Sequence, residues 1–202
     1  VFRLLEDLRS KKTNSARKLR TEIAKENQEF ANCDQQDAGE FLRKLISSLH
    51  LEEMFKFKTN RKLTGTVCNQ SYSTEVGQDV ILNEAINYSS IESIFGKSSN
   101  ESTLIKKCDI CSINNDVPYK VKDVLISTSD LFIISLNRFR DNLSKINSRV
   151  DPTQSIDVLG NSYKLKSVVS HIGGSLAEGH YIAALLHEDK WINVNSNQVD
   201  CE

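Results

Sequence analysis

A histidine and an asparagine near the C-terminal end of the chain could form the basic part of a cysteine-protease site. His180 follows Gly179 and precedes Tyr181, and Asn195 ends the later segment 191–195. Both segments read as strands joined by a turn at 188–190, so we expect a hairpin that brings His180 close to Asn195. There the imidazole would withdraw a thiol proton and later protonate the leaving amine, while the amide oxygen fixes the ring. Gly179 has no side chain to block a substrate backbone. The alternative is a surface histidine beside a strand.

A pair of carboxylates far upstream could bind a basic peptide. The strongest predicted helix begins near Asp34, which can cap its first turn. Its apolar stripe comprises Ala38, Phe41, Leu42, Leu45, Ile46 and Leu49. Asp37 and Glu40 are three positions apart and share the opposite face, where they could form charge-assisted hydrogen bonds with cationic groups. The alternative is simple capping and a solvated face. Gly39 inside this helix costs about 1 kcal/mol relative to Ala, and indicates close approach by another backbone.

The cysteine spacing suggests part of a structural zinc site. Cys108 and Cys111 form a C-x-x-C pair, and Cys68 is a third candidate ligand, but Ser71 stands where a fourth would be expected. Three thiolates and a neutral hydroxyl make a poor structural zinc site, so the alternative is a decayed site with ordinary thiols. Cys33 precedes a helix N-terminus, which favours a thiolate.

The predicted elements are helices first and strands afterwards. Helical spacing of apolar residues predicts helices over 2–8 and 16–24 before the one near Asp34. Beyond about residue 57 the alternation predicts strands over 63–68, 74–82, 119–126, 131–137, 163–171, 181–187 and 191–194. This order predicts an α+β fold with an antiparallel sheet.

Three further segments have their own signatures. The run 131–136 is continuously apolar, as expected for a central strand covered on both faces. Segment 89–103 is polar around a short apolar centre, which predicts a loop with one short helix. Segment 142–160 is polar and contains Pro152, which predicts an exposed excursion.

Composition excludes several classes of function. The 202 residues carry a formal net charge of −1 and no dominant block of Lys or Arg, so nucleic acid is not an expected partner. No apolar run approaches the roughly 20 residues that a membrane helix needs. Five scattered cysteines without an export signal favour reduced thiols in the cytoplasm or nucleus. Because Val1 is not Met and lies in a predicted helix, we expect a fragment or a processed piece.

Three blocks, in order, resemble the ubiquitin-specific proteases, a papain-like deubiquitinase family. QQDAGEFL at 35–42 is similar to the family's QQDAxEFL box, and LFIISLNRF at 131–139 is similar to its strand ending in LxRF. Segments 168–175, 179–183 and 191–195 together resemble its histidine box. The resemblance covers essentially the whole chain and implies one partial protease domain over 1–202. A helical thumb would occupy about 1–57, and β fingers with an antiparallel palm sheet about 58–202.

The resemblance implies a role for each matching residue. His180 matches the catalytic base and Asn195 the third triad member. Asp37 and Glu40 match carboxylates that bind arginines of the ubiquitin C-terminal tail. The glycine-rich segment 171–179 matches a loop that closes over that tail, and the substrate-binding candidates in and beside it are His171, Gly173, Gly174, Gly179 and Tyr181. Cys68, Cys108 and Cys111 match three of four zinc ligands in the fingers.

The chain departs from the family pattern at three places. The box that holds the nucleophilic cysteine precedes the first helix and is not found, so we expect the nucleophile upstream of Val1 and expect this chain alone to be inactive. Cys33 adjoins the helix where the family has no nucleophile and is rejected for that role. Ser71 replaces a zinc ligand, and Ser196 stands where many members have an acidic residue.

The function expected from the resemblance is cysteine-type hydrolysis of isopeptide bonds at the ubiquitin C-terminus, with no catalytic cofactor. Ubiquitin or ubiquitinated proteins are the expected partners, and an activating protein is a further candidate. Neither nucleic acid nor membrane is an expected partner. One alternative is a ubiquitin-binding pseudo-protease or incomplete domain, because His180 and Asn195 cannot replace a missing nucleophile. A more distant one is a processing enzyme for another ubiquitin-like modifier.

Overall fold

Two compact units divide the chain. The computed structural model describes residues 15–32, 34–86, 89–96, 101–108, 116–140, 144–175 and 178–195. One unit comprises Val1–Glu53, Phe139–Lys145 and Leu165–Glu202, and the other comprises Met54–Arg138 and Ile146–Lys164. We refer to them as unit 1 and unit 2. Among the described residues, no helix has the length and apolar character needed to cross a membrane. The helix predicted over 2–8 lies outside the described residues.

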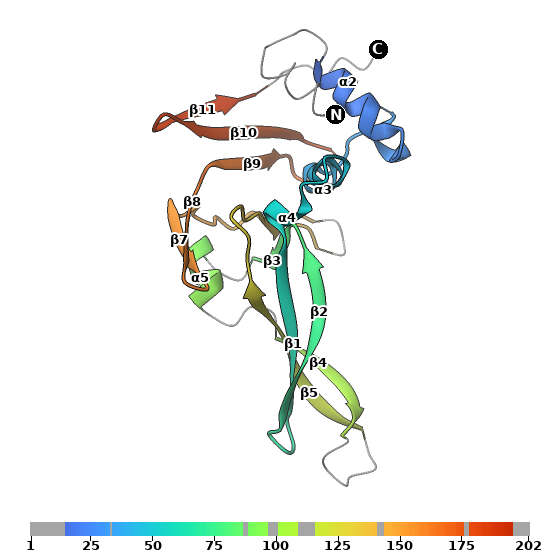
Figure 1. Ribbon diagram of the computed structural model, residues 1–202, viewed down its shortest axis with the longest axis vertical. Helices are drawn as coiled ribbons and strands as arrows, with labels where there is room; N and C mark the ends of the chain where they lie inside the picture. The colour runs from blue at the N-terminus through green and yellow to red at the C-terminus, as the bar shows by residue number, and fades with distance from the viewer. Residues whose placement is uncertain are drawn as a thin grey trace. The chain divides into compact units, whose positions relative to one another are not determined.

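Unit 1 has a small helical core. Helix α2 (Ser15–Ala24) is followed by the short helix η1 (Gln28–Phe30) and by α3 (Ala38–Ser48) (Figure 1). Leu19, Ile23 and Phe30 are buried together, and Phe41 and Leu45 of α3 pack against them. The rings of Phe30 and Phe41 meet edge to face at 5.3 Å. This packing confirms the helix predicted over 16–24 and the apolar stripe of the next one.

Helix α3 begins later than predicted. Its N-cap is Asp37, whose backbone is extended and whose Oδ1 accepts a hydrogen bond of 2.8 Å from the N–H of Glu40. Asp34, the predicted cap, instead accepts a side-chain hydrogen bond from Asn32. The prediction about Gly39 was also wrong, since the nearest atom to a Cβ there would be Oδ1 of Asp37, at 3.0 Å, and not another backbone. The first turn is therefore organised by its own capping side chain.

The sheet of unit 1 has three antiparallel strands in the order β11-β10-β9. They are β9 (Ser167–Ile172), β10 (His180–His187) and β11 (Lys190–Val194). Strands β10 and β11 form a hairpin whose two loop residues, Glu188 and Asp189, have φ of 47° and 61°. Positive φ at both loop residues is the pattern of a type I′ turn, whose twist matches that of the strands. The predicted hairpin is confirmed.

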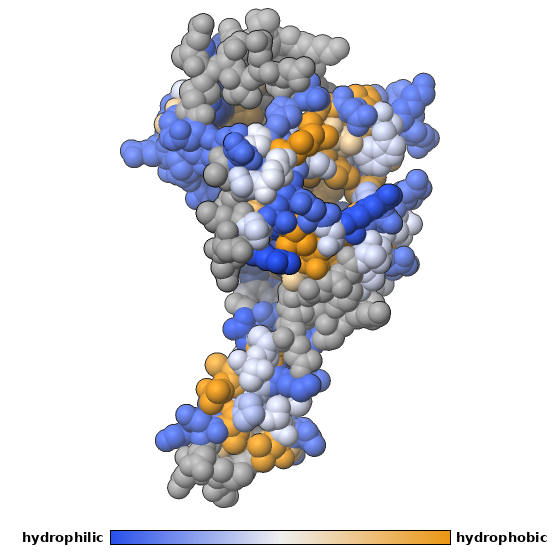
Figure 2. Space-filling model, turned by 180° about the vertical axis from the view of Figure 1, so that it is seen from behind, coloured by the Kyte–Doolittle hydropathy of each residue, from blue (hydrophilic) through white to orange (hydrophobic). Residues whose placement is uncertain are grey.

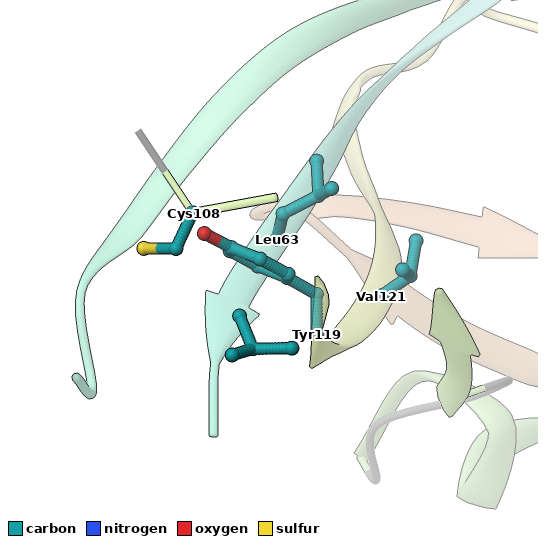
Figure 3. Packing of buried hydrophobic residues seen from close by; sticks show 5 residues of the cluster. Leu63, Cys108, Tyr119 and Val121 are labelled. Carbon is teal, nitrogen blue, oxygen red and sulfur yellow. The ribbon is translucent and has the colours of Figure 1, made fainter. Parts of the chain in front are cut away.

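Unit 2 is built on a four-stranded antiparallel sheet in the order β2-β1-β5-β4 (Figure 1). The strands are β1 (Phe57–Gly65), β2 (Ser71–Asp79), β4 (Glu101–Lys107) and β5 (Asp116–Ser127). Helix α4 (Glu52–Phe55) precedes β1. Leu63, Val117, Tyr119 and Val121 alternate with exposed residues and bury one face together with Cys108 (Figure 3). Period-two burial of this kind is what a half-solvated antiparallel sheet requires.

Hydrophobic side chains also remain exposed on this sheet. Ile105 and Leu104 of β4 are 67% and 44% exposed, and Val67, just after β1, is 54% exposed. Figure 2 shows hydrophobic surface at the lower end of the molecule, where this sheet ends. Singly exposed apolar residues are normal on protein surfaces and need no special explanation.

The remaining elements of unit 2 pack around the ring of Phe132. They are β3 (Leu82–Ala85) and β6 (Ile134–Asn137), which pair in parallel, the hairpin β7 (Ser155–Val158) and β8 (Asn161–Lys164), and helix α5 (Ile91–Gly96). The Phe132 ring lies 6.1 Å from Phe57, 5.9 Å from Phe95 and 5.6 Å from Tyr163, measured between centroids. These contacts join β1, α5 and β8 to the segment before β6.

Several strand boundaries differ from the prediction. The predicted strand 163–171 is two strands, β8 and β9, which belong to different units. Strand 74–82 breaks at the buried pair Val80 and Ile81, and strand 63–68 ends at Gly65. The region 131–137 is ordered as a strand from Ile134 on, and Leu131 is 41% exposed, so it is not a central strand covered on both faces.

Two segments predicted to be irregular contain strands. Segment 89–103 holds the short helix that was predicted, α5, but β4 begins within it at Glu101. Segment 142–160 holds β7, whose Val158 is 2% exposed, so this part is not an exposed excursion. A polar sequence can still form a strand when its partner supplies the backbone hydrogen bonds, as β5 and β8 do here.

Candidate active site

His180 and Asn195 meet at the open end of the β10–β11 hairpin. His180 is the first residue of β10, and Asn195 directly follows β11. The register pairs Ala183 with Val194, so one further step places Asn195 opposite Ile182, on the same face as His180 and diagonal to it. Nε2 of His180 lies 2.6 Å from Oδ1 of Asn195. The two residues that the sequence singled out are therefore in direct contact.

The hydrogen bond assigns the tautomer of His180. A carboxamide oxygen can only accept, so Nε2 must carry the proton and donate it to Oδ1 of Asn195. In the neutral ring Nδ1 then holds a free lone pair and can accept a proton from another group. Asn195 is exposed and His180 is partly exposed, so a reacting group can reach the ring from solvent. An imidazole held in this way can act as a general base.

A row of rings supports the start of β10. Tyr181 pairs with His171 across β10 and β9, and their ring centroids lie 5.0 Å apart. The ring of Phe139 meets His171 on another side at 5.6 Å. The Tyr181 hydroxyl donates a 3.4 Å hydrogen bond to Oδ2 of Asp37. Burial, and then the charge of Asp37, raise the pKa of Tyr181 above its ordinary value, so the hydroxyl stays protonated as this donor.

The two carboxylates are exposed, but they do not share a helix face. Asp37 lies outside the helix as its N-cap, with Oδ1 bonded to the N–H of Glu40 and Oδ2 to Tyr181. Glu40 lies in the first turn, where its charge is favourable, and forms a 3.6 Å ion pair with Lys44. The capping interpretation of Asp37 is thus confirmed. Both side chains are still accessible to a cationic ligand.

The glycines of segment 171–179 have different reasons to be glycine. A Cβ at Gly179 would lie 2.0 Å from Nε2 of His171, so the imidazole occupies the place of a side chain. Gly173 has φ of +147°, and a Cβ there would lie 2.7 Å from the carbonyl oxygen of Glu178. A Cβ at Gly174 would meet no atom within 4 Å. His171, Gly173 and Gly179 therefore form one packed cluster, and Gly174 faces open space.

Two residues of this site hold backbone carbonyls, a role that the sequence did not predict for either of them. Nε2 of Gln35 donates to the carbonyl oxygen of Gly179 at 2.5 Å, and Nζ of Lys145 donates to the carbonyl oxygen of His171 at 2.6 Å. Gln35 lies in the QQDAGEFL block and Lys145 in a polar segment. Since both contacts join distant parts of the chain, spacing alone could not reveal them. Gln35 and Asp37 thus attach the helical part of unit 1 to the start of β10, whereas Lys145 binds the end of β9.

The zinc candidates lie in unit 2. Sγ of Cys68 lies 3.8 Å from Sγ of Cys108, close to the spacing of about 3.8 Å expected for two thiolates on one tetrahedral zinc ion. The Ser71 hydroxyl, however, is hydrogen-bonded to the Thr64 hydroxyl at 2.7 Å. Cys111 lies outside the described residues, among which no group of three or more His, Cys, Asp or Glu could hold a metal. The described residues supply two sulfur ligands and do not by themselves make a zinc site.

The thiols are part of an apolar core. Cys108 is 6% exposed and packs with Leu63, Tyr119 and Val121 (Figure 3). The hydrogen bond between Cys108 and the Tyr119 hydroxyl, together with burial, raises the pKa of Tyr119 above its ordinary value. A Cβ at Gly65 would lie 2.9 Å from Sγ of Cys68. Apolar packing alone therefore accounts for the positions of both thiols.

Comparison with known families settles the relationship. The family model for ubiquitin carboxyl-terminal hydrolase matches residues 1–201. The chain belongs to this family. Ubiquitin carboxyl-terminal hydrolase 14 of Arabidopsis thaliana is 41% identical over 59 residues, which cover 29% of this chain and 7% of that protein. Ubiquitin carboxyl-terminal hydrolase 11 of Schizosaccharomyces pombe is 27% identical over 205 residues, which cover 86% of this chain and 58% of that protein.

Solved structures of a DUB module show the same fold. The SAGA Ubp8/Sgf11/Sus1/Sgf73 DUB module bound to ubiquitin aldehyde matches with a TM-score of 0.74 at 19% identity. The match covers 92% of this chain and 49% of that chain. The same module bound to monoubiquitin gives the same TM-score. This likeness confirms the predicted papain-like α+β fold, and the chain spans about half the length of the solved neighbour.

Proposed function

We propose that this chain supplies the general base and the tail-binding surface of a cysteine-type deubiquitinase. The observation that carries the proposal is the 2.6 Å hydrogen bond between His180 and Asn195, which fixes the imidazole with Nδ1 as the acceptor. Membership of the ubiquitin carboxyl-terminal hydrolase family supports the choice of substrate. The bond cleaved would be the isopeptide bond between the ubiquitin C-terminal glycine and a lysine amine.

The proposed reaction needs a thiol, an imidazole and an amide, and no cofactor. Nδ1 of His180 takes the thiol proton, and the thiolate sulfur attacks the isopeptide carbonyl carbon. The imidazolium then returns this proton to the lysine nitrogen as the carbon–nitrogen bond breaks, leaving a thioester on the enzyme. Water, deprotonated by His180, hydrolyses the thioester and regenerates the thiol. Throughout, Asn195 holds the Nε2–H and thus the ring orientation.

We place the nucleophilic cysteine in sequence upstream of Val1. The relatives are longer than this chain, which covers 58% of the S. pombe protein and 49% of the solved neighbour, so they contain additional sequence that can hold such a residue. Cys108 is unsuited because it is buried in the core of unit 2, and Cys68 because it is partly buried and packs against that core. A buried thiol in apolar surroundings is a poor nucleophile.

The tail-binding surface would consist of Asp37, Glu40 and the segment between β9 and β10. Both carboxylates are exposed, and Asp37 is connected to the start of β10 through Tyr181. Carboxylates so placed can form charge-assisted hydrogen bonds with the cationic side chains of a basic peptide. The ubiquitin tail would then run beside Gly174 and Gly179 toward His180.

Further partners and the cellular setting follow from the same proposal. The solved neighbour is a module of four named proteins bound to ubiquitin aldehyde. By analogy we propose that ubiquitin is the substrate and that an activating protein assists this chain. We further propose a cytoplasmic or nuclear location, where the thiols stay reduced.

The proposal is tested with ubiquitin that carries a thiol-reactive group at its C-terminus. The protein is used with this chain and its upstream sequence, as wild type, as His180→Ala and as His187→Ala. His187 is the control, because it lies at the other end of β10 and is exposed. We expect an adduct at an upstream cysteine in the wild type and the control, and at least 100-fold slower labelling in His180→Ala.

Three results would contradict the proposal in different ways. Equal labelling of His180→Ala and wild type would show that His180 is not the base. Ubiquitin binding without labelling would favour a pseudo-protease. Faster cleavage of a SUMO-type or NEDD8-type substrate than of ubiquitin would assign the chain to another modifier.

A further inference from the structure

The segment Phe139–Lys145 of unit 1 is attached to the chain that leads from β9 to His180. Phe139 and Lys145 pair as an isolated bridge, and the N–H of Arg140 donates to the carbonyl of Ser144 at 3.0 Å. Ser144 in turn pairs with Ser175, two residues beyond Gly173. The described ends of this segment are therefore bonded to each other, and Ser144 joins them to the residues that follow β9.

At the end of this segment, the ammonium group of Lys145 contacts three acceptors. Nζ lies 2.6 Å from the carbonyl oxygen of His171, 2.9 Å from that of Gly173 and 3.3 Å from Nδ1 of His171. A lysine ammonium has three donors and no acceptor, so these three groups match its capacity. Hydrogen bonds from a charged donor are stronger than neutral ones. The carbonyls on both sides of Ile172, at the end of β9 and just after it, are thus held by one side chain.

The contacts continue from these carbonyls to the catalytic histidine. The conformation of Gly173 brings the chain so close to Glu178 and Gly179 that a Cβ would lie 2.7 Å and 2.9 Å from their atoms. The imidazole of His171 fills the space where a Gly179 side chain would stand. Gly179 is followed directly by His180. Lys145 thereby fixes the two residues against which the end of the loop rests.

The imidazole of His171 is neutral in this arrangement. Burial and the nearby charge of Lys145 lower its pKa, with a smaller opposing effect of Asp37. Because Nδ1 accepts from Lys145, the ring proton is on Nε2, the atom that faces Gly179. His171 is therefore a packing element of the loop and does not compete with His180 as a base.

We propose that Lys145 is a positioning residue that holds the residues directly after β9 against Glu178 and Gly179, in the arrangement that receives the C-terminal tail of ubiquitin. This inference rests on the proposed function. The His180–Asn195 bond lies within the β10–β11 hairpin and does not involve Lys145. Loss of the ammonium group should therefore weaken the binding of substrate much more than it slows the chemical step.

The test compares variants in the protein that contains this chain and its upstream sequence. Lys145→Met removes the donors, Lys145→Gln keeps two N–H donors without the charge, and Lys166→Met is a control at an exposed lysine just before β9. With ubiquitin joined to a fluorogenic amine, we expect Lys145→Met to raise KM about 10- to 100-fold and to leave kcat within about threefold. Lys145→Gln should raise KM less, and the control should match the wild type.

A second readout does not depend on activity. Amide hydrogen exchange of residues 171–175 should be at least tenfold faster in Lys145→Met than in the wild type, and unchanged in Lys166→Met. A wild type without turnover would overturn the proposed function, and the exchange measurement would still decide the role of Lys145. Unchanged KM and exchange in Lys145→Met, or a fall in kcat with unchanged KM, would overturn the inference. If Lys145→Met does not fold, the KM of Lys145→Gln tests the inference, and an unchanged KM in that variant would overturn it.

Discussion

The substitution Gly179→Ala tests the packing next to His180, the proposed general base. An added Cβ would lie 2.0 Å from Nε2 and 2.5 Å from Cε1 of His171, and 2.7 Å from the carbonyl oxygen of Ile172. Ordinary contacts begin at 3.4 Å, so the chain or the ring has to move by about 1.4 Å. The ring has little freedom, because Phe139 and Tyr181 pack on it and Lys145 bonds to Nδ1. The backbone at Gly179 must therefore shift.

The expected cost follows from the position of this shift. His180 is the next residue, and a displacement of about 1 Å at a reacting group costs on the order of 100-fold in rate. We expect kcat/KM of Gly179→Ala on a ubiquitin substrate to fall by about that factor. Overpacking of this size also costs about 1–3 kcal/mol in the free energy of unfolding, which a thermal melt detects.

Two comparison variants make this measurement specific. Gly174→Ala adds the same methyl group where no atom of this chain lies within 4 Å, so its free energy of unfolding should stay within about 0.5 kcal/mol of the wild type. In the double variant with His171→Ala, the ring clash is removed but the contact with the Ile172 carbonyl remains, so we expect about a tenfold recovery relative to Gly179→Ala. An unfolding free energy of Gly179→Ala equal to that of Gly174→Ala, or a kcat/KM of Gly179→Ala equal to that of the wild type, would refute the reasoning.

Three other predictions concern the base, a buried acid and the thiols. Asn195→Ala should lower kcat up to about 100-fold with little change in KM, because it removes the group that orients His180; steady-state kinetics with an unchanged kcat would contradict this. Burial raises the pKa of Glu84, which is 6% exposed and whose Oε2 has no hydrogen-bond partner among the described residues. Stability should therefore fall as the pH rises above about 4.5, the ordinary pKa of Glu, and through the raised pKa, because the unfolded state ionises first. Urea unfolding should show Glu84→Gln gaining about 1–3 kcal/mol over the wild type between pH 4 and pH 8, and a pH-independent difference would rule out this origin. Since Ser71 is bonded to Thr64, elemental analysis of the purified protein should find far less than one zinc per chain, and stoichiometric zinc that is lost in Cys108→Ser would show that the metal site is intact.

The parts of the site that a local pattern could reveal were predicted from sequence. The hairpin that joins His180 to Asn195 follows from alternation and a short polar connection, and the hydrogen bond between them is a direct consequence of that register. The apolar stripe of α3 was predicted, but its first residue was not, because Asp34 and Asp37 are both good caps. Only the local backbone decides which one accepts from the helix N–H groups.

Other features depend on contacts between distant segments, which spacing does not encode. No Gly or Pro marks the break between β8 and β9, so the two strands were predicted as one. The strand β4 has a polar sequence and becomes a strand through its pairing with β5. The roles of Gln35 and Lys145 are likewise set by partners more than 20 residues away in the chain.

The interleaved order of the two units has a consequence for synthesis of the protein. Unit 1 combines Val1–Glu53 with Phe139–Lys145 and Leu165–Glu202, whereas unit 2 is complete once Lys164 has been made. Unit 2 therefore emerges from the ribosome before β9, β10 and β11 do. The helices α2 and α3 must wait for their partner strands, while unit 2 has long enough to fold. Truncation after unit 2 should thus leave the early helices without a sheet, and His180 and Asn195 leave the ribosome only after all of unit 2.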